Sequence, residues 1–439
     1  MILTLILNGG IYYVRFFRRK IIMGLYLVKQ NTYDFFLNVK TLLLAGNILL
    51  AMFQWSILFA ITRFIGIDSA GEYSIGTMIT APVFLFLNLQ LRVKLATDND
   101  SIIDEYIYVK LRLILSIVAI SVCFLLSFLL DFDDVRNPIL LIFLMSIIKL
   151  FDGFFDINYG FFQKNGDFKK YAISMIYRSI IGMVFVITSI CITNKIEVII
   201  FFVILSQIFS YIIYDNRFFL IFYKGMFKHK SDLSIYMLLI KTTLPLGVAS
   251  ILDTLLINSQ KYILINEFSI SDLGVYTVLF QYIIIFQIII TTTGQYFIPK
   301  MSKYYKVKNG EYEKTLFKCI IISILVGICG LVISHFFGRY IIFSFFGFYN
   351  DNYLNLLKYF SLTGMFLYIS SAIGYFLISM GKFNYNLISI AISLLVTLVL
   401  TVVLISSYGL LGGVLSLSCG YIVRIILMSA FFSYEYKKI

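Results

Sequence analysis

Residues 139–160 read ILLIFLMSIIKLFDGFFDINYG, a stretch long and apolar enough to cross a lipid bilayer as one helix. A membrane-spanning helix needs about 20 predominantly apolar residues. Lys149, Asp152 and Asp156 interrupt the apolar run, and a charge at the centre of a span costs about 2.5–3.5 kcal/mol on insertion scales. The stretch therefore predicts a transmembrane helix whose charged residues serve either helix pairing or a transport path.

The whole chain has the same character. Of its 439 residues, 60% are hydrophobic and 13% are charged, whereas globular proteins have about 45–50% apolar and about 25% charged residues. We therefore predict an all-α, polytopic membrane protein. A hydropathy window places twelve spans, near residues 42–64, 73–91, 110–130, 139–160, 171–193, 197–214, 242–264, 275–298, 316–336, 357–380, 385–406 and 410–432.

The charges orient these spans. With twelve helices, 27 of the 36 Lys and Arg residues fall on the side of the termini and 6 on the other side. Lys and Arg accumulate in cytoplasmic loops, so we expect both termini in the cytoplasm. The net charge of +13 then reflects orientation and contact with anionic lipid, and no nucleic-acid partner is expected.

The most polar long connection divides the spans into six and six. The expected organisation is a cytoplasmic segment (1–41), a six-helix bundle (42–214), a cytoplasmic linker (215–241), a second six-helix bundle (242–432) and a cytoplasmic tail (433–439). Residues 1–22 have their basic cluster after the apolar run, unlike a secretory signal. They are either native or an extension from an early start codon.

The two halves share a short motif. Gly71-Glu72-Tyr73-Ser74 and Gly274-Val275-Tyr276-Thr277 each follow the first span of their half, 203 residues apart. Because both halves begin on the same side of the membrane, this repeat would be parallel, with its axis along the membrane normal.

Four stretches carry a resemblance to a known family. They are GEYSIGTMITAPVFLFLNLQLRVKLATD (71–98), KLFDGFFDINYGFFQKNGDFKKYAISMIYRS (149–179), LPLGVASILDTLLINSQKYILINEFSISDLGVYT (244–277) and QYFIPKMSKYY (295–305). From about residue 23 onward the chain resembles the polysaccharide flippases of the multidrug/oligosaccharidyl-lipid/polysaccharide exporter superfamily. The resemblance implies a V of two six-helix bundles in a bacterial cytoplasmic (inner) membrane, and export by alternating access of undecaprenyl-diphosphate-linked repeat units for O-antigen or capsule. The implied partners are the lipid-linked glycan, membrane lipids and other polysaccharide assembly proteins.

The best candidate site is a polar stripe on the fourth span. Its members fall within about 80° of one another on a helix of 100° per residue, and they are Lys149, Asp152, Asp156, Tyr159 and Gln163. They could line a substrate cavity, or Lys149 and Asp152 could form an ion pair that only holds helices together.

Further candidates are Asp253 with Lys261 on the seventh span, Arg178, Arg424 and Arg92. For Asp253 the alternative is structural pairing. Arg178 and Arg424 lie about 8 residues from the cytoplasmic end, so snorkelling to the interface is their alternative. Arg92 could bind a headgroup phosphate or anchor the second span at the interface.

The charges counted inside the spans balance. Lys149, Arg178 and Arg424 oppose Asp152, Asp156 and Asp253, so either burial protonates a carboxylate or the cations and acids cluster separately. We expect no metal site and no cofactor, with H⁺ or Na⁺ as the candidate coupling ions.

Three functions remain open. A flippase, which is no enzyme, agrees with the stripe, the six-plus-six layout and the resemblance. A multidrug or small-solute cation-coupled antiporter of the same fold is the main alternative. A membrane glycan polymerase is the third, and it would be expected to have a larger external loop than residues 337–356 provide.

Overall fold

The protein is an all-helical membrane protein. The computed structural model describes residues 39–97, 103–130, 137–226, 233–307 and 311–436, and these ranges contain no strand. The predicted segment 1–41 lies almost wholly outside them. The helices are α2 (Val39–Ala60), the π-helix η1 (Ile61–Ile65), α3 (Ile67–Leu87), α4 (Leu91–Thr97), α5 (Glu105–Leu129), α6 (Pro138–Lys164), α7 (Phe168–Ile192), α8 (Ile196–Tyr214), α9 (Arg217–Met226), α10 (Leu233–Glu267), α11 (Ile270–Val307), α12 (Glu311–Phe346), α13 (Asp351–Ser379), α14 (Phe383–Tyr408) and α15 (Leu410–Tyr436).

Twelve helical stretches in the described ranges are long and apolar enough to cross a membrane, which confirms the predicted number of spans. α3 and α4 together form the second span. The seventh span is longer than hydropathy indicated, because α10 begins at Leu233 rather than near residue 242. α9 lies in the connection between the two sets of six spans.

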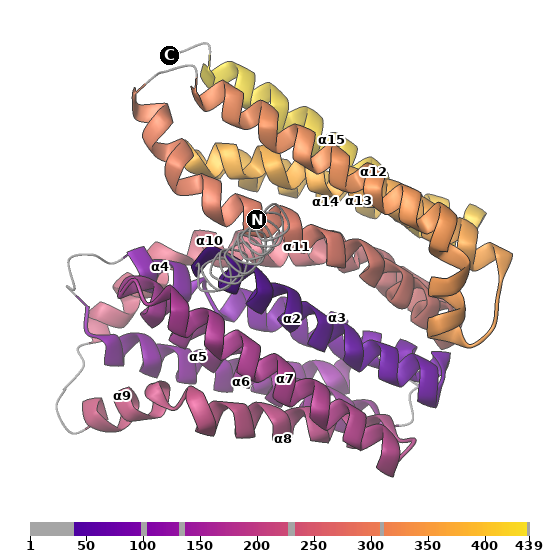
Figure 1. Ribbon diagram of the computed structural model, residues 1–439, viewed down its shortest axis with the longest axis horizontal. Helices are drawn as coiled ribbons and strands as arrows, with labels where there is room; N and C mark the ends of the chain where they lie inside the picture. Colours follow the sequence, from indigo (N-terminus) through magenta and orange to yellow (C-terminus); the bar gives the residue numbers. More distant parts are fainter. Residues whose placement is uncertain (1–38, 98–102, 131–136, 227–232, 308–310, 437–439) are drawn as a thin grey trace, which may run out of the picture.

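The helices form two layers (Figure 1). α2 to α9 make the lower layer of that view, and α11 to α15 make most of the upper layer. Within the first half α2 packs on α7 and α5 on α6, and within the second half α13 packs on α11, α12 and α15. The halves meet mainly where α3 contacts α10 and α11.

Matching residues of the two halves touch one another at this contact. Ser74 and Thr277, 203 positions apart, share a hydrogen bond of 2.7 Å between buried hydroxyls. Asp68 likewise accepts a hydrogen bond from Ser271, its own counterpart at the same separation. A residue can contact its counterpart only beside the axis that relates the two halves, so these contacts mark a pseudo-twofold axis between α3 and α11.

Two glycines allow the halves to approach at this axis. A Cβ atom on Gly71 would lie 2.2 Å from the carbonyl oxygen of Ile270, and one on Gly274 would lie 2.3 Å from that of Ile67. Backbone cannot retreat as a flexible side chain can, so only glycine fits at either position.

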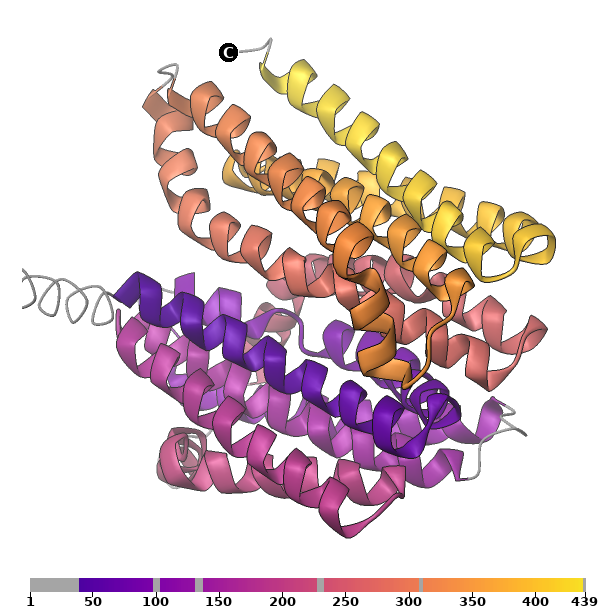
Figure 2. The ribbon, with the colours of Figure 1, turned by 45° about the vertical axis from the view of Figure 1, so that its right-hand side comes forward.

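Contacts between the halves continue toward one end of the molecule. There Arg63 of η1 donates a hydrogen bond of 3.3 Å to the carbonyl of Phe343, and Trp55 packs edge-on against Phe345 at 4.8 Å. Figure 2 shows the α12–α13 connection reaching the first half at this end, whereas the layers stand apart at the other. We call the end with η1 the closed end, and the end with α4 and α9 the basic end.

The second span is broken near the basic end. Leu89 and Gln90, between α3 and α4, have φ of 49° and 50°. The left-handed region costs a non-glycine residue roughly 1–2 kcal/mol, so surrounding contacts must hold the break. Leu89 is buried, Gln90 donates a hydrogen bond of 2.8 Å to Ser250 of α10, and Gly247 leaves room for the bend.

Candidate functional site

The polar stripe of α6 lies against three other helices of the first half. Two carboxylates one turn apart, Asp152 and Asp156, each take up a position between two cations. Lys149 Nζ lies 3.2 Å from Asp152, and Arg178 of α7 donates to the other oxygen of the same carboxylate. Arg112 of α5 lies 2.8 Å and Arg92 of α4 3.5 Å from Asp156.

These six side chains, which we call the charge ladder, are Lys149, Asp152, Arg178, Arg112, Asp156 and Arg92. Four are cations and two are anions, so the ladder has a formal charge of +2. The side chains of Lys149, Asp152 and Asp156 are 30%, 28% and 32% exposed. Charged groups facing hydrocarbon would be costly, so the exposed part of the ladder is suited to a water-accessible path.

Two of the hydrogen-bond donor nitrogens of Arg112 have no partner among the described residues. Its side chain is fully buried, one Nη2 bond goes to Asp156, and Nε and Nη1 have no hydrogen-bond partner in the described part of the chain. The buried hydroxyl of Ser116, one turn further along α5, also lacks a partner there. Gly153 of α6 lies beside both, since its Cβ would be 3.4 Å from Arg112 Cδ and 3.7 Å from Ser116 Oγ. Unsatisfied buried donors cost about 1–3 kcal/mol each, so an acceptor such as a phosphate oxygen or water would stabilise this place.

Arg92 anchors the basic end of the ladder. Its guanidinium donates to Gln163 at 3.1 Å and to the Tyr171 hydroxyl at 2.7 Å, and it lies over the rings of Tyr159 and Tyr171. The break in the second span puts Arg92 here, because α4 starts a new helix one residue before it. The two stripe residues nearest the basic end, Tyr159 and Gln163, thus contact Arg92.

Arg178 is fixed inside the bundle rather than snorkelling to the interface. It is 6% exposed, donates to Gln207 of α8 at 2.8 Å and lies 4.3 Å from the centroid of the Phe155 ring.

A third carboxylate, Asp215, follows α8 and accepts a hydrogen bond of 2.5 Å from Ser174. Burial raises the pKa of Asp215 to about 6.

The candidates of the second half form a separate, neutral pair. Arg424 of α15 lies 2.8 Å from Asp253 of α10, so the two predicted residues meet across the bundle. Lys261 does not join them. It is buried two turns further along α10, with its ammonium 5.7 Å from the centroid of the Phe280 ring.

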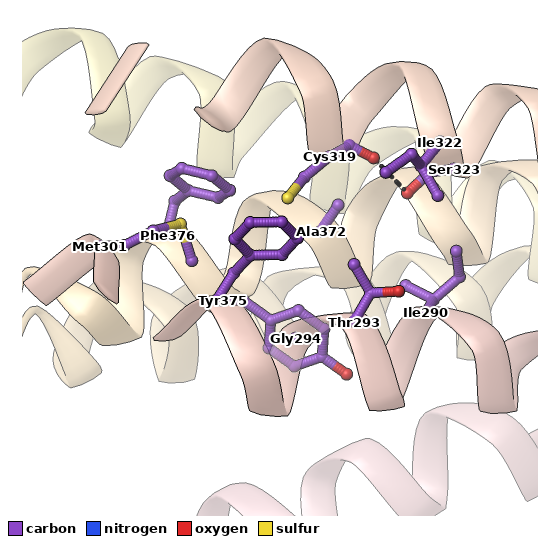
Figure 3. A pocket seen from close by; sticks show the side chains of 11 residues that line it. Ile290, Thr293, Gly294, Met301, Cys319, Ile322, Ser323, Ala372, Tyr375 and Phe376 are labelled. Atoms are coloured by element: carbon purple, nitrogen blue, oxygen red, sulfur yellow. Dashed lines mark hydrogen bonds between the residues drawn. The ribbon is translucent and has the colours of Figure 1, made fainter. Parts of the chain in front are cut away.

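A small cavity also lies in the second half, between α11, α12 and α13 (Figure 3). Thr293, Ser323 and Tyr375 are among the residues around it, and its volume is about 10 Å³. That is about the space one water molecule needs, so the cavity cannot hold an organic substrate.

The structure thus brings seven of the ten predicted site residues together in the first half and pairs two more in the second. Lys261 lies apart, and Arg92, predicted at the end of its span, lies within the ladder. Sequence reasoning missed Arg112 and Gln207. Arg112 lies at the edge of the predicted third span, so it was counted among the cations of the preceding loop. In the structure α5 begins seven residues before Arg112, which places it inside the helix.

Comparisons with known proteins agree with this architecture. No family model matches the chain. The chain is 29% identical over 401 residues to the capsular polysaccharide biosynthesis protein CapF of Staphylococcus aureus. The aligned residues cover 90% of this chain and 97% of CapF.

Solved structures show the same fold. The lipid II flippase MurJ in an inward closed conformation superposes with a TM-score of 0.68 at 15% identity, over 90% of this chain and 87% of MurJ. The MATE multidrug transporter DinF-BH, solved as a ligand complex, gives 0.69 at 15% identity, over 90% and 94%. An outward-facing MATE transporter of the MOP superfamily gives 0.66 at 12% identity, over 91% and 96%. The predicted all-α, MATE-like fold is confirmed.

Proposed function

We propose that the protein is a flippase that moves undecaprenyl-diphosphate-linked oligosaccharide repeat units from the cytoplasmic to the outer leaflet of a bacterial cell membrane. The observation that carries this proposal is the charge ladder, which places four cations and two carboxylates inside the membrane-spanning part of the first half. The similarity to CapF, whose name states capsular polysaccharide biosynthesis, supports the choice of substrate class.

The ladder suits a diphosphate diester in charge and in spacing. Such a diester has one negative charge on each phosphate, and the ladder has one cation in excess around each carboxylate. Asp152 and Asp156 are four residues apart, about 6 Å along the helix, which allows one phosphate beside each. The carboxylates hold the arginines in place while the site is empty, and the phosphates then take hydrogen bonds from donors such as Arg112 Nε and Nη1.

The charge of the ladder argues against one of the other functions, and its position argues against the second. A transporter of cationic drugs needs acceptors and a negative site, whereas the ladder has a surplus of positive charge and Asp253 is already paired with Arg424. A polymerase must bind glycan chains outside the membrane, yet the ladder lies within the spans. The coupling ion, H⁺ or Na⁺, stays a prediction, as do the assembly partners.

In this proposal the basic end faces the cytoplasm, as the distribution of Lys and Arg predicts. The contacts of Gly71, Ser74 and Arg63 then seal the outer side, and the ladder receives its substrate from the inner leaflet. Separation of the halves at the closed end and their approach at the basic end would release the glycan outward.

The test is complementation of a strain that lacks the gene. Arg112→Ala and Arg178→Ala should each reduce surface polysaccharide at least tenfold and leave lipid-linked repeat units on the cytoplasmic leaflet. Arg112→Lys keeps the charge but loses the fork of donors, and it should retain partial export. Lys170→Ala is the matched control, since Lys170 is an exposed cation of α7 outside the ladder.

Membrane levels of each variant must be equal, because loss of one partner of a buried ion pair destabilises by about 3–5 kcal/mol. Normal export by the Arg112→Ala/Arg178→Ala double variant would refute the site. Unchanged polysaccharide in the deletion strain, with altered drug sensitivity, would favour the antiporter.

A further inference from the structure

A groove lies on the flank of the second half at the closed end. It has a volume of about 910 Å³, within the range of roughly 300–1,000 Å³ typical of ligand sites. Its floor is one face of α13, and its walls come from Asp272 of α11, from α12 and from the turn that joins α14 to α15. Its α11 wall adjoins the contact between the halves, since Ser271, beside Asp272, donates a hydrogen bond to Asp68. No residue of the charge ladder lines the groove.

The α13 face of the groove changes chemistry with depth. From the closed end inward it presents Asn352 and Asn355, then Lys358 and Tyr359, then Leu362. These positions span about 15 Å along the helix. Leu331 of α12, fifteen residues before the end of its helix, adds to the apolar part.

Three polar side chains of the groove are available to a ligand, whereas Asp272 accepts a hydrogen bond from the Ser269 hydroxyl. Within the described residues, the side-chain amides of Asn352 and Asn355 make no hydrogen bond, and Lys358 has no carboxylate within ion-pair distance. Two exposed tyrosines flank the groove, Tyr359 at 43% and Tyr408 at 61% exposure. Tyrosine suits a surface that is apolar at one end and wet at the other.

We propose that this groove binds the lipid-linked glycan in the outer leaflet, after translocation. The order of groups along α13 matches the order along that molecule: amides for sugar hydroxyls outermost, a cation for phosphate at the interface, and leucines for the polyprenyl chain below. A phospholipid would occupy only the lower two levels and leave Asn352 and Asn355 in water. The inference rests on the proposed function, because it takes the same substrate class and the same orientation in the membrane.

Native mass spectrometry of the full-length protein tests the proposal, with undecaprenyl-diphosphate-linked N-acetylglucosamine and phosphatidylglycerol as probes. The wild type should bind two copies of the glycolipid, one at the ladder and one in the groove. Lys358→Ala/Tyr359→Ala and Asn352→Ala/Asn355→Ala should each bind one copy, with at least tenfold weaker binding at the lost site. Tyr340→Ala is the control, since Tyr340 is a 74% exposed tyrosine of α12 outside the groove.

The asparagine pair separates glycolipid from phospholipid. Its replacement should weaken the glycolipid and leave phosphatidylglycerol binding unchanged, whereas equal loss of both lipids would make the groove an ordinary lipid contact and overturn the proposal. Two bound copies in both groove variants would also overturn it. If the wild type bound one copy of the glycolipid, and only Arg112→Ala lost it, the groove would be refuted as a site and the proposed function would stand. No bound glycolipid together with no export by the wild type would refute the proposed function itself.

Discussion

Asp215 is a buried carboxylate beside the ladder. Its Oδ2 accepts a hydrogen bond from Ser174, and its backbone carbonyl accepts one from the Asn158 amide. Its other oxygen, Oδ1, has no partner in the described part of the chain. Burial is the main cause of its raised pKa, and the hydrogen bonds from Ser174 and Asn158 and the charge of Arg178 only partly offset it. Asp215 therefore stays protonated in the folded protein up to about pH 6, while an unfolded aspartate ionises near pH 4.

This preference makes stability depend on pH. The stabilisation that comes from burying the neutral carboxyl group of Asp215 is fully present below about pH 4. It is lost as the pH rises through about 6, because the folded protein must then ionise a buried group. Asp215→Asn removes the ionisation, so its stability relative to the wild type should rise by about 1 kcal/mol between pH 5 and pH 8. Thermal unfolding in detergent at the two pH values measures the change. A difference independent of pH would contradict the prediction.

Single residues also show where sequence reasoning was sufficient and where it was not. The stripe from Lys149 to Gln163 was visible because polar residues at helical spacing stand out on an apolar helix. Arg112 was not, since a cation near the end of a span has the same local sequence whether it meets lipid headgroups or turns inward to Asp156. The pairing partner comes from another helix, and no local pattern specifies it.

At the scale of elements, the broken second span determines where Arg92 lies. A continuous helix through residues 67–97 would rotate and shift every residue after Leu87. The break instead starts α4 at Leu91 and turns Arg92 toward Asp156 and Gln163. This arrangement requires Leu89 and Gln90 to adopt the unfavourable left-handed backbone conformation.

The relative stability of the Gln90→Gly and Gln90→Ala variants shows whether the second span is broken or continuous at this position. Neither side chain can make the bond to Ser250, so they differ only in backbone preference. In the left-handed conformation Gln90→Gly should be more stable than Gln90→Ala by about 1–2 kcal/mol. In a continuous helix alanine would be more stable by about 1 kcal/mol, so the order of the two thermal midpoints decides the question.

Hydropathy predicted the spans themselves well, because length and apolar content are properties of each segment alone. It could not predict the break. The proline of this span, Pro82, lies inside the continuous part of α3, and the residues at the break are leucine and glutamine, which do not signal a turn. The break depends on α10, whose Gly247 and Ser250 face it.

At the scale of the whole molecule, the two halves close on a pair of glycines. An added methyl group at Gly71 or Gly274 would meet backbone oxygen of the other half within 2.3 Å. In the proposed mechanism the halves move apart as units, which would relieve this contact without unfolding the surrounding helices.

Gly71→Ala and Gly274→Ala should therefore hold the closed end open and reduce export at least tenfold, with little loss of protein in the membrane. Spin labels on cysteines at Phe64 and Phe348, in a variant without the native cysteines, report the separation of the halves. The mean distance should increase by several ångströms in both variants. Gly330→Ala is the control, since its nearest neighbours would be ring atoms of Phe286 at 3.9 Å. An unchanged distance in Gly71→Ala would contradict the proposed role of this contact.

The hydrogen bond between Ser74 and Thr277 also has a consequence for biogenesis. Its two residues are 203 positions apart, and ribosomes add about 5–20 residues per second. During synthesis the α3 surface around Gly71 thus waits roughly 10–40 s for its partner. We therefore expect the newly made first half to expose this surface to pairing with a wrong helix until α11 is inserted.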